Sequence, residues 1–511
     1  MTSAQICIII AIAVYLIAMV FVGVAYSRAS KGGADSFYLG GRQLGPVVTA
    51  MSAEASDMSS WLLMGLPGVA YFTGIADAAW TAIGLALGTY LNFLLVAKRL
   101  RIYSAEINAI TVPEFFSKRF KDDKKALLGI SALIILIFFI PYTASGFNAC
   151  GTLFSSLFGV DYFTAMVVSA VVIVLYTALG GFLAASTTDL IQSIIMTIAL
   201  IIVVFFGIHM AGGWSSVISN AQTLPGYLSF TQTYDAASGT AAAYTPLTIV
   251  STLAWGLGYF GMPHILLRFM AIEDVNKLST SRRIGTTWVV ISMAIAVLIG
   301  VVGNGMIHAG ALDEIPAADS QRIIIKISTL LSSYGVLPAI VAGLILSGIL
   351  AATMSTADSQ LLAAASSVTQ DLLQGTMKIK LSDKAAMIIA RLTVVVIAIV
   401  GVIWARNEGS VFTIVSFAWA GFGAAFGPVV LLALFWKRSN KYGALAGMVA
   451  GGVMVFVWKY AIAPMGGIFK IYELMPAFVI AIVVNVIVSL ATKAPDDSVV
   501  KEYDEVAAMN R

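Results

Sequence analysis

Acidic and hydroxyl-bearing residues occur in an unexpected place, residues 52–68, which read SAEASDMSSWLLMGLPG. The flanking stretches 44–50 and 61–72 are apolar, so Glu54 and Asp57 should fall near mid-depth of a membrane-spanning segment. A carboxylate at that depth opposes insertion by about 2.5–3.5 kcal/mol and usually marks the path of an ion or solute. The stretch therefore predicts an ion or solute site inside a membrane.

The same stretch should also interrupt its helix. Ser59 and Ser60 are small, and Gly65 and Pro67 follow them within two turns. Glycine and proline weaken helical continuity, and an interrupted helix leaves backbone carbonyl groups without partners. Inside a membrane such carbonyl groups are tolerated where they bind an ion or line a cavity. We therefore expect cation ligands at this break.

Two further stretches carry polar or irregular features within apolar surroundings. Residues 255–263, WGLGYFGMP, place three glycines and a proline in mid-span and predict a second interrupted helix lined by aromatic side chains. On a helix, Ala352, Ser355 and Thr356 stand at i, i+3 and i+4, so one carbonyl and two hydroxyl groups share a face. Oxygen ligands of this kind suit a hard cation. Asp358 and Ser359 extend that polar surface, and Asp189 is another carboxylate within a span.

Composition identifies the class of protein. Of 511 residues, 59% are hydrophobic and 11% are charged, whereas about a quarter are charged in a typical soluble domain. Cys7 and Cys150 lie in apolar stretches without metal-ligand spacing, and the three histidines are scattered. We therefore expect an all-α polytopic membrane protein without a catalytic module, a nucleic-acid partner or an obligate protein partner. Its surroundings are the lipid bilayer.

Apolar runs of about 20 residues predict thirteen transmembrane helices. They are expected at 5–26, 44–72, 76–97, 126–155, 160–180, 184–211, 246–269, 284–308, 336–373, 385–405, 410–436, 442–463 and 473–492.

Charge sets the expected orientation in the plasma membrane. Most of the 30 Lys and Arg residues fall in alternate connections, beginning with the one after the first helix. Because basic residues favour the cytoplasmic side, the N-terminus should be outside and the C-terminus inside. The loop 212–245 has no Lys or Arg and should be external, residues 320–335 should form a short external amphipathic helix, and the polar tail after Lys493 should be mobile.

The two interrupted helices lie five spans apart, an odd number that inverts the direction of the chain. Interrupted helices at matching positions of two inverted halves point to the central site of a transporter. We therefore expect an inverted five-plus-five helix repeat with discontinuous helices at its centre. The predicted units are a leading helix with an internal loop, the first repeat, an external loop, the second repeat, two trailing helices and a cytoplasmic tail, at 1–43, 44–211, 212–245, 246–436, 437–492 and 493–511 respectively.

Four long runs, SDMSSWLLMGLPG, AWGLGYFGMPHILLRFMA, ILAATMSTADSQLL and SFAWAGFGAAFGPVVL, closely resemble the sodium/solute symporter family, in particular its bacterial proline-transporting branch. The resemblance extends from about Tyr38 to the last span. It implies the same five-plus-five repeat with one leading and two trailing helices. It also implies inward sodium flow coupled to uptake of L-proline by alternating access, with sodium as the coupling ion.

The resemblance implies specific site residues. Sodium would bind the backbone carbonyl groups of Ala55, Met58 and Ala352 and the hydroxyl groups of Ser355 and Thr356, with Asp57 in support. Proline contacts would fall on Ser59, Trp61, Gly65, Tyr142, Trp255, Tyr259 and Pro263. Relatives that move two sodium ions use positions like Asp189, Ser355, Asp358 and Ser359, so a second cation, sodium or a proton, is a further hypothesis.

Two positions depart from the family pattern. Ser60 replaces a glycine, which affects the backbone at the break, and Glu54 replaces a small residue. Glu54 could take part in coupling, face a water-filled vestibule, or pair with a cation such as Arg268.

Simpler interpretations also apply to the site residues. Ser355 and Thr356 could mediate helix packing, and Trp255 and Tyr259 could be ordinary core aromatics.

Other functions compete with proline symport. A channel would need a continuous pore signature, which the interrupted helices do not provide. A sodium symporter for another amino acid or for pantothenate is the main alternative. A membrane enzyme or sensor would need catalytic groups or soluble modules that the sequence lacks.

Overall fold

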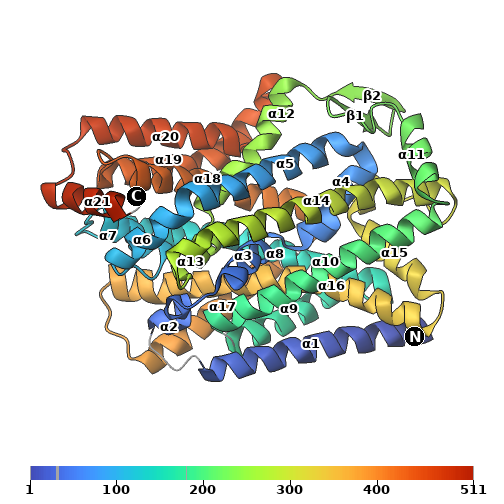
Figure 1. The fold of residues 1–511 in the computed structure, drawn as a ribbon, viewed down its shortest axis with the longest axis horizontal. Coiled ribbons are helices and arrows are strands. Elements are labelled where there is room, and N and C mark those ends of the chain that lie inside the picture. The colour runs from blue at the N-terminus through green and yellow to red at the C-terminus, as the bar shows by residue number, and fades with distance from the viewer. Residues whose placement is uncertain (1, 30–33, 180, 510–511) are drawn as a thin grey trace.

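Helices make up most of the described chain, and most of them run along the long axis of the molecule in Figure 1. The computed structural model describes residues 2–29, 34–179 and 181–509. Residues 30–33, 180 and 510–511 lie outside the described residues; they belong to the predicted internal loop, the end of the predicted helix 160–180 and the predicted tail.

The helices, in chain order, are α1 (Ser3–Ala29), α2 (Ala34–Leu39), α3 (Pro46–Asp57), α4 (Leu66–Thr73), α5 (Ile75–Leu91), α6 (Lys98–Glu106), α7 (Val112–Arg119), α8 (Ala126–Phe158), α9 (Tyr162–Leu179), α10 (Phe182–Met210), α11 (Trp214–Thr223), α12 (Pro246–Leu253), α13 (Pro263–Ala271), α14 (Leu278–His308), α15 (Ile323–Ser332), α16 (Val336–Ser366), α17 (Asp383–Trp404), α18 (Val411–Phe435), α19 (Lys441–Val457), α20 (Leu474–Ala491) and α21 (Asp497–Met509). Two strands, β1 (Gln232–Asp235) and β2 (Thr240–Ala243), form an antiparallel hairpin.

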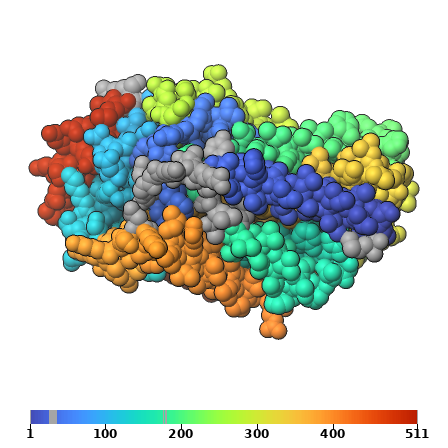
Figure 2. Space-filling model, turned by 90° about the horizontal axis from the view of Figure 1, so that it is seen from below, coloured from blue at the N-terminus to red at the C-terminus, as the bar shows by residue number. Residues whose placement is uncertain are grey.

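Each of the thirteen predicted segments contains helical residues. Within the described residues, ten helices are long and apolar enough to cross a membrane, and two further apolar helices, 61–73 and 162–175, are shorter. The N- and C-termini lie at opposite ends of the long axis (Figure 1). Helix α1 lies lengthwise across one face of the molecule (Figure 2) and exposes Val14, Ile17 and Phe21, as expected of a lipid-facing helix.

Both predicted interruptions are present. Helix α3 begins with Pro46 in its first turn, where the missing N–H costs nothing, and ends at Asp57. Met58 and Ser59 leave the helix, a wide π-helical turn covers Trp61–Gly65, and α4 follows with Pro67 in its first turn. The second interruption is a 3₁₀ segment, Ala254–Gly261, between α12 and α13.

The prediction of a purely helical chain is wrong for the loop 212–245, which contains α11 and the β1–β2 hairpin. The hairpin turns at Asp235, whose carboxylate accepts hydrogen bonds from the Ala237 N–H (3.0 Å) and the Ser238 hydroxyl (2.7 Å). Gly239 adopts φ +66°, a conformation that glycine adopts without strain. Asp-Ala-Ala-Ser-Gly is thus a turn signal, but it is short and has few apolar neighbours.

The prediction of a mobile tail is also wrong. Helix α21 places Val499, Tyr503 and Val506 at i, i+4 and i+7, and both valines are buried. The Tyr503 ring lies 5.1 Å from the buried Arg119 guanidinium of α7. The tail therefore docks on the same end of the molecule as α7. By contrast, the amphipathic helix predicted within 320–335 is confirmed as α15.

Glycines allow the second interrupted helix to approach α5 closely. A Cβ atom added at Gly256 would lie 2.2 Å from the Gly84 carbonyl oxygen, and one added at Gly88 would lie 2.4 Å from the Gly256 carbonyl oxygen. Backbone atoms cannot move aside as a flexible side chain can. The 3₁₀ segment is therefore held against α5 by backbone contact.

We predict that Gly256→Ala lowers the free energy of unfolding by about 3 kcal/mol, because the added methyl group forces two backbones apart. Thermal unfolding of the detergent-purified chain measures the effect. Gly452→Ala is the matched control, since its added Cβ would meet Ala425 Cβ at 3.8 Å, an ordinary contact. Equal melting temperatures for the two variants would contradict this account of the packing.

Candidate functional site

The predicted sodium ligands come together where α3 ends against α16. The Ser355 hydroxyl donates to the Ala55 carbonyl oxygen at 2.8 Å, and the Thr356 hydroxyl does so at 3.5 Å. The Ala352 carbonyl oxygen lies 3.2 Å from the Ser355 hydroxyl. Met58 follows at the first non-helical position and is fully buried. Four of the five predicted ligands thus share direct contacts, and all of their polar atoms are uncharged oxygens, a donor set that suits a hard monovalent cation.

Asp57 links three parts of the structure. Its carbonyl oxygen accepts hydrogen bonds from the Trp61 indole and from the Tyr142 hydroxyl of α8, both at 3.1 Å. Its carboxylate accepts a 2.5 Å hydrogen bond from the Tyr259 hydroxyl of the 3₁₀ segment. Asp57 is 1% exposed. The two interrupted helices therefore meet at Asp57.

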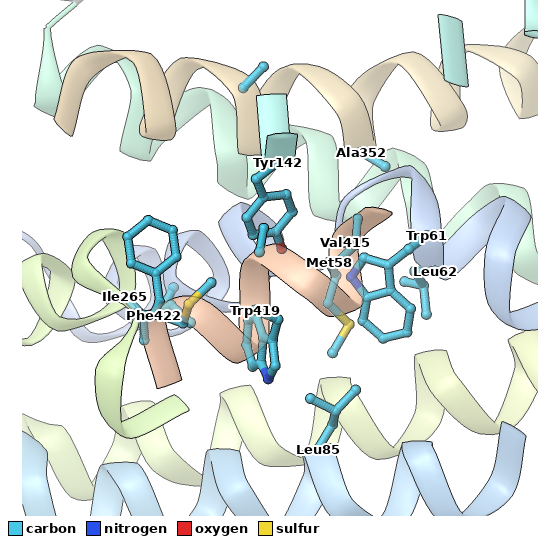
Figure 3. Close-up of a cluster of buried hydrophobic side chains, with 14 of the residues drawn as sticks. Met58, Trp61, Leu62, Leu85, Tyr142, Ile265, Ala352, Val415, Trp419 and Phe422 are labelled. Carbon is cyan, nitrogen blue, oxygen red and sulfur yellow. The ribbon is translucent and has the colours of Figure 1, made fainter. Parts of the chain in front are cut away.

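Aromatic side chains surround the break. The rings of Trp61 and Trp255 lie 6.3 Å apart, and the Met58 and Trp61 side chains lie next to each other (Figure 3). Four predicted substrate contacts thus lie close to one another: Trp61, Tyr142, Trp255 and Tyr259. A ring-lined region beside polar backbone can hold a compact solute with a charged end.

The remaining predicted substrate residues lie at the edges of this cluster. Ser59 is buried and its hydroxyl has no hydrogen-bond partner. Gly65 faces Phe412, whose Cβ atom lies 3.1 Å from the position of an added glycine Cβ. Pro263 begins α13, beyond the other end of the 3₁₀ segment from Trp255. Pro263 therefore lies at the end of the second interruption.

Three aromatic residues of the cluster were not predicted. Trp419 donates from its indole to the Trp255 carbonyl oxygen at 2.8 Å, and Phe412 and Tyr472 each lie 5.1 Å from the Trp255 ring. Trp419 belongs to the run SFAWAGFGAAFGPVVL, where the aromatic residues alternate with glycine and alanine. That pattern was the sequence feature from which Trp419 could have been predicted. Tyr472 carries no local signal, because its proximity depends on how α20 packs.

A cavity of about 370 Å³ adjoins this cluster. Its lining includes the buried residues Gly65 and Gln321, the half-buried Phe412, and the more exposed Asp319 and Glu408. Arg322 pairs with Glu408 at 2.7 Å. Phe412 therefore lies between the cavity and Trp255.

The predicted second cation site contains the side chain of Arg268. Its guanidinium lies 3.1 Å from the Asp189 carboxylate and 2.6 Å from the Ser359 hydroxyl. It also donates to the Ser52 hydroxyl at 3.0 Å, and the Ser52 hydroxyl donates to Asp189 at 2.6 Å. Arg268 thus pairs with Asp189, and the hypothesis that it pairs with Glu54 is wrong. The position of Arg268 along α13 determines its carboxylate partner, because Arg268 faces α10 and the first half of α3.

Asp358 has a different environment from Asp189. Its Oδ1 atom accepts from the Ser359 hydroxyl at 3.2 Å, while its Oδ2 atom is buried without a hydrogen-bond partner. Asp358 also lines a small cavity of about 10 Å³ with Thr177 and Leu362. A space of that size holds about one water-sized occupant. Asp189 Oδ1 also has no hydrogen-bond partner, but of the two predicted carboxylates it is Asp358 that lines this cavity.

Glu54 is fully buried, and the hypothesis that it faces a water-filled vestibule is wrong. Helices α5 and α14 and the 3₁₀ segment pack around α3 and bury the Glu54 side chain.

Comparison with known proteins agrees with this architecture. A family model described as "Sodium:solute symporter family" matches residues 37–451. The chain is 43% identical over 491 residues to the osmoregulated proline transporter OpuE of Bacillus subtilis, covering 96% of this chain and 95% of the relative. It is 42% identical over 503 residues to the sodium/proline symporter of Haemophilus influenzae, covering 97% of each chain.

A solved structure shares the fold. The substrate-bound, outward-open state of a Na⁺-coupled sialic acid symporter superposes with a TM-score of 0.77 at 19% identity, covering 96% of this chain and 99% of that chain. With the family match extending over most of the sequence, the chain belongs to the sodium:solute symporter family.

Proposed function

We propose that this protein couples inward sodium flow to the uptake of L-proline by alternating access. Its family is one of transporters and not of enzymes. The observation that carries the proposal is the meeting of the Ser355 and Thr356 hydroxyls with the Ala55 carbonyl at an interrupted, buried helix. Curated relatives that share more than 40% of its residues are named for proline transport.

The proposed sodium site consists of the Ala55, Met58 and Ala352 carbonyl groups with the Ser355 and Thr356 hydroxyls, supported by Asp57. Every one of these residues is at most 3% exposed. Without a cation, each of the two hydroxyl groups donates a hydrogen bond to a carbonyl oxygen. When sodium binds, the Ser355 and Thr356 hydroxyl oxygens direct their lone pairs to the ion. Asp57 contributes a negative charge that the neutral ligands lack.

The proposed substrate site lies beside it and uses Ser59, Trp61, Gly65, Tyr142, Trp255, Tyr259 and Pro263. Proline carries a carboxylate, an amine and a compact apolar ring, so it needs polar groups and aromatic walls together. The unpartnered Ser59 hydroxyl and the non-helical backbone provide polar groups. Trp61 and Trp255 provide aromatic walls.

The second cation site, formed by Asp189, Ser355, Asp358 and Ser359, remains a proposal with Asp358 as its free carboxylate. Arg268 already neutralises Asp189. Asp358 keeps one unpartnered oxygen beside a cavity of about 10 Å³. A sodium ion or a proton there would balance its charge.

The proposed topology has thirteen transmembrane helices in a plasma membrane, with the N-terminus outside. Residues 44–211 and 246–436 form the inverted five-helix repeats, each containing one interruption. The proposed topology is completed by the leading helix (1–43), the external loop (212–245), the trailing helices (437–492) and the cytoplasmic tail (493–511). Impermeant thiol labelling of Ser238→Cys in intact cells tests the orientation, and labelling only after lysis would contradict it.

The first prediction concerns the transport activity. The purified chain in proteoliposomes should accumulate labelled L-proline against its gradient when sodium is high outside, because the two solutes share one transport cycle. Replacing sodium by choline should abolish accumulation. Unlabelled proline should compete, whereas other amino acids and pantothenate should not.

Several outcomes would contradict these proposals. Uptake that persists in choline would exclude sodium coupling, and preferential competition by another solute would replace proline as the substrate. Reversal potentials in the same vesicles give the sodium-to-proline ratio. A ratio near one that Asp358→Asn leaves unchanged at several pH values would exclude the second cation site.

A second prediction tests the sodium ligands. Ser355→Ala and Thr356→Ala should each raise the half-saturating sodium concentration for proline uptake roughly tenfold, which corresponds to about 1.4 kcal/mol of lost binding free energy. Ser347→Ala is the control, because Ser347 is buried on the same helix and its hydroxyl donates to the Gly343 carbonyl of its own helix. Equal sodium dependence in all four proteins would disprove the assignment.

A third prediction tests the aromatic wall. Trp255→Phe should weaken proline binding roughly threefold to tenfold at saturating sodium, since an aromatic contact contributes about 0.5–1.5 kcal/mol. Competition binding with labelled proline measures it. Trp80→Phe serves as control, because Trp80 bonds to the Phe230 carbonyl outside the cluster. A Trp255 variant with wild-type affinity would remove this residue from the substrate site.

A further inference from the structure

Arg282, near the start of α14, carries a charge that no other side chain balances. Among the residues that the structure describes, its guanidinium group forms no ion pair. Its Nε atom is enclosed by the protein without a hydrogen-bond acceptor. Thr286, one turn further along α14, has a buried hydroxyl that also lacks a partner, so the two groups do not bond to each other. A guanidinium group has five N–H donors, and the acceptors for Arg282 therefore have to come from outside the chain.

Other arginines of the predicted internal segments do have acceptors within the chain. Arg99 donates to the Leu434 carbonyl oxygen at 3.0 Å, and Arg101 donates to the Ile272 carbonyl oxygen at 2.8 Å. Both carbonyl groups lie at helix ends, where backbone acceptors are free. Arg282 instead lies within α14, which contains no acidic residue. The one acidic residue of the neighbouring helix α5, Asp77, lies in its first turn.

Tyr90 of α5 holds the Arg282 side chain at the surface of the molecule. Helices α5 and α14 pack side by side (Figure 1). The guanidinium carbon of Arg282 lies over the Tyr90 ring, 5.2 Å from its centre, a distance at which a cation is attracted to the ring. Tyr90 is 40% exposed, and the two Nη atoms of Arg282 are open to the surface. The charged end of Arg282 is therefore oriented with its outer donors free.

The surface around this arginine is apolar. On α5, Leu87 and Leu94 are exposed one turn to either side of Tyr90, and on α14 Val290 and Ile291 are exposed. Both helices belong to segments that are long and apolar enough to cross a membrane, so these side chains face acyl chains. A cation on such a surface is unfavourable unless a counter-ion accompanies it. The lipid itself is the available source of that counter-ion.

We propose that Arg282, positioned by Tyr90, binds the phosphate group of an anionic phospholipid whose acyl chains lie along α5 and α14. Arg283 follows it, is exposed, and forms no ion pair among the described residues, so it adds a second positive charge. The inference does not depend on the proposed sodium and proline sites. It rests on the proposed topology for the leaflet alone, which is the cytoplasmic one, where anionic lipids attract basic residues.

Charge and shape together select the class of ligand. Two adjacent arginines without ion-pair partners attract a headgroup of net negative charge. A zwitterionic headgroup such as phosphatidylcholine carries its own cation, which the same arginines repel. A phosphate ion from water offers the same oxygen acceptors, but it leaves the exposed side chains of Leu87 and Ile291 uncovered. An anionic phospholipid satisfies both the donors and the apolar flanks.

The test is titration of dioleoylphosphatidylglycerol into the purified full-length chain in detergent, with bound lipid counted by native mass spectrometry. Wild type should bind this lipid more tightly than dioleoylphosphatidylcholine, which has the same acyl chains. Arg282→Gln should weaken binding of the anionic lipid roughly tenfold, because a hydrogen bond between charged groups is lost. Tyr90→Leu should weaken it about twofold to fivefold, whereas Tyr90→Phe keeps the ring and should bind as wild type does.

Arg391→Gln is the matched control for the loss of one positive charge. Arg391 is an exposed arginine of α17, a helix that packs against α8, α9 and α16. This variant should keep the wild-type affinity for dioleoylphosphatidylglycerol, because its charge is lost far from Tyr90. Inorganic phosphate, added at the same concentration as the lipid, should not displace it.

Each other outcome overturns the proposal. Equal affinity in wild type and Arg282→Gln removes the site, and equal losses in Arg282→Gln and Arg391→Gln reduce it to attraction by overall charge. Equal binding of the two lipids excludes an anionic headgroup, and displacement by inorganic phosphate replaces the lipid by a phosphate ion. If Arg282→Gln does not fold, the two Tyr90 variants decide, and equal affinities in Tyr90→Leu and Tyr90→Phe count against the site. None of these results affects sodium-coupled proline uptake, which is measured separately.

Discussion

The end of α3 inside the protein is the constraint on which the rest of the structure depends. A helix that stops within a membrane leaves carbonyl groups that lipid cannot satisfy, so other elements must supply donors. Helix α16 supplies the Ser355 and Thr356 hydroxyls to Ala55, and α8 supplies the Tyr142 hydroxyl to Asp57. Each donor is a group that a bound cation could displace. The same interruption therefore fixes the packing and creates the site.

Burying a charged carboxyl group is unfavourable, and the four buried carboxyl groups near the site differ in how their charge is compensated. Asp189 has a fixed counter-ion in Arg268, whose guanidinium also bonds to Ser359. Asp57 has the short hydrogen bond from Tyr259. Asp358 adjoins a small cavity, and Glu54 forms no ion pair with any residue that the structure describes. A group whose charge is already balanced can stay fixed, whereas one that is unbalanced is open to exchange of protons or ions.

Close backbone packing explains why the second interruption can position Tyr259 and Trp255. An added Cβ at Gly258 would overlap the Trp419 indole, which donates to the Trp255 carbonyl oxygen. With Gly256 against Gly84 on the other side, the 3₁₀ segment lies between α5 and α18. Its side chains therefore face the end of α3 from a rigid backbone. In alternating access, α18 and α5 would have to move with it or slide past it as units.

The sequence alone determined the features that depend on local pattern: the apolar segments, both interruptions, and the shared helix face of Ala352, Ser355 and Thr356. Local signals that were weak, such as the turn at Asp235 and the valine spacing of α21, were missed. Only the tertiary structure decided which charges meet. Arg268 and Asp189 are 79 residues apart, and Tyr259 and Asp57 are 202 apart. Periodicity predicts which face of a helix is polar, but the partner of that face depends on how separate helices rotate and pack against one another.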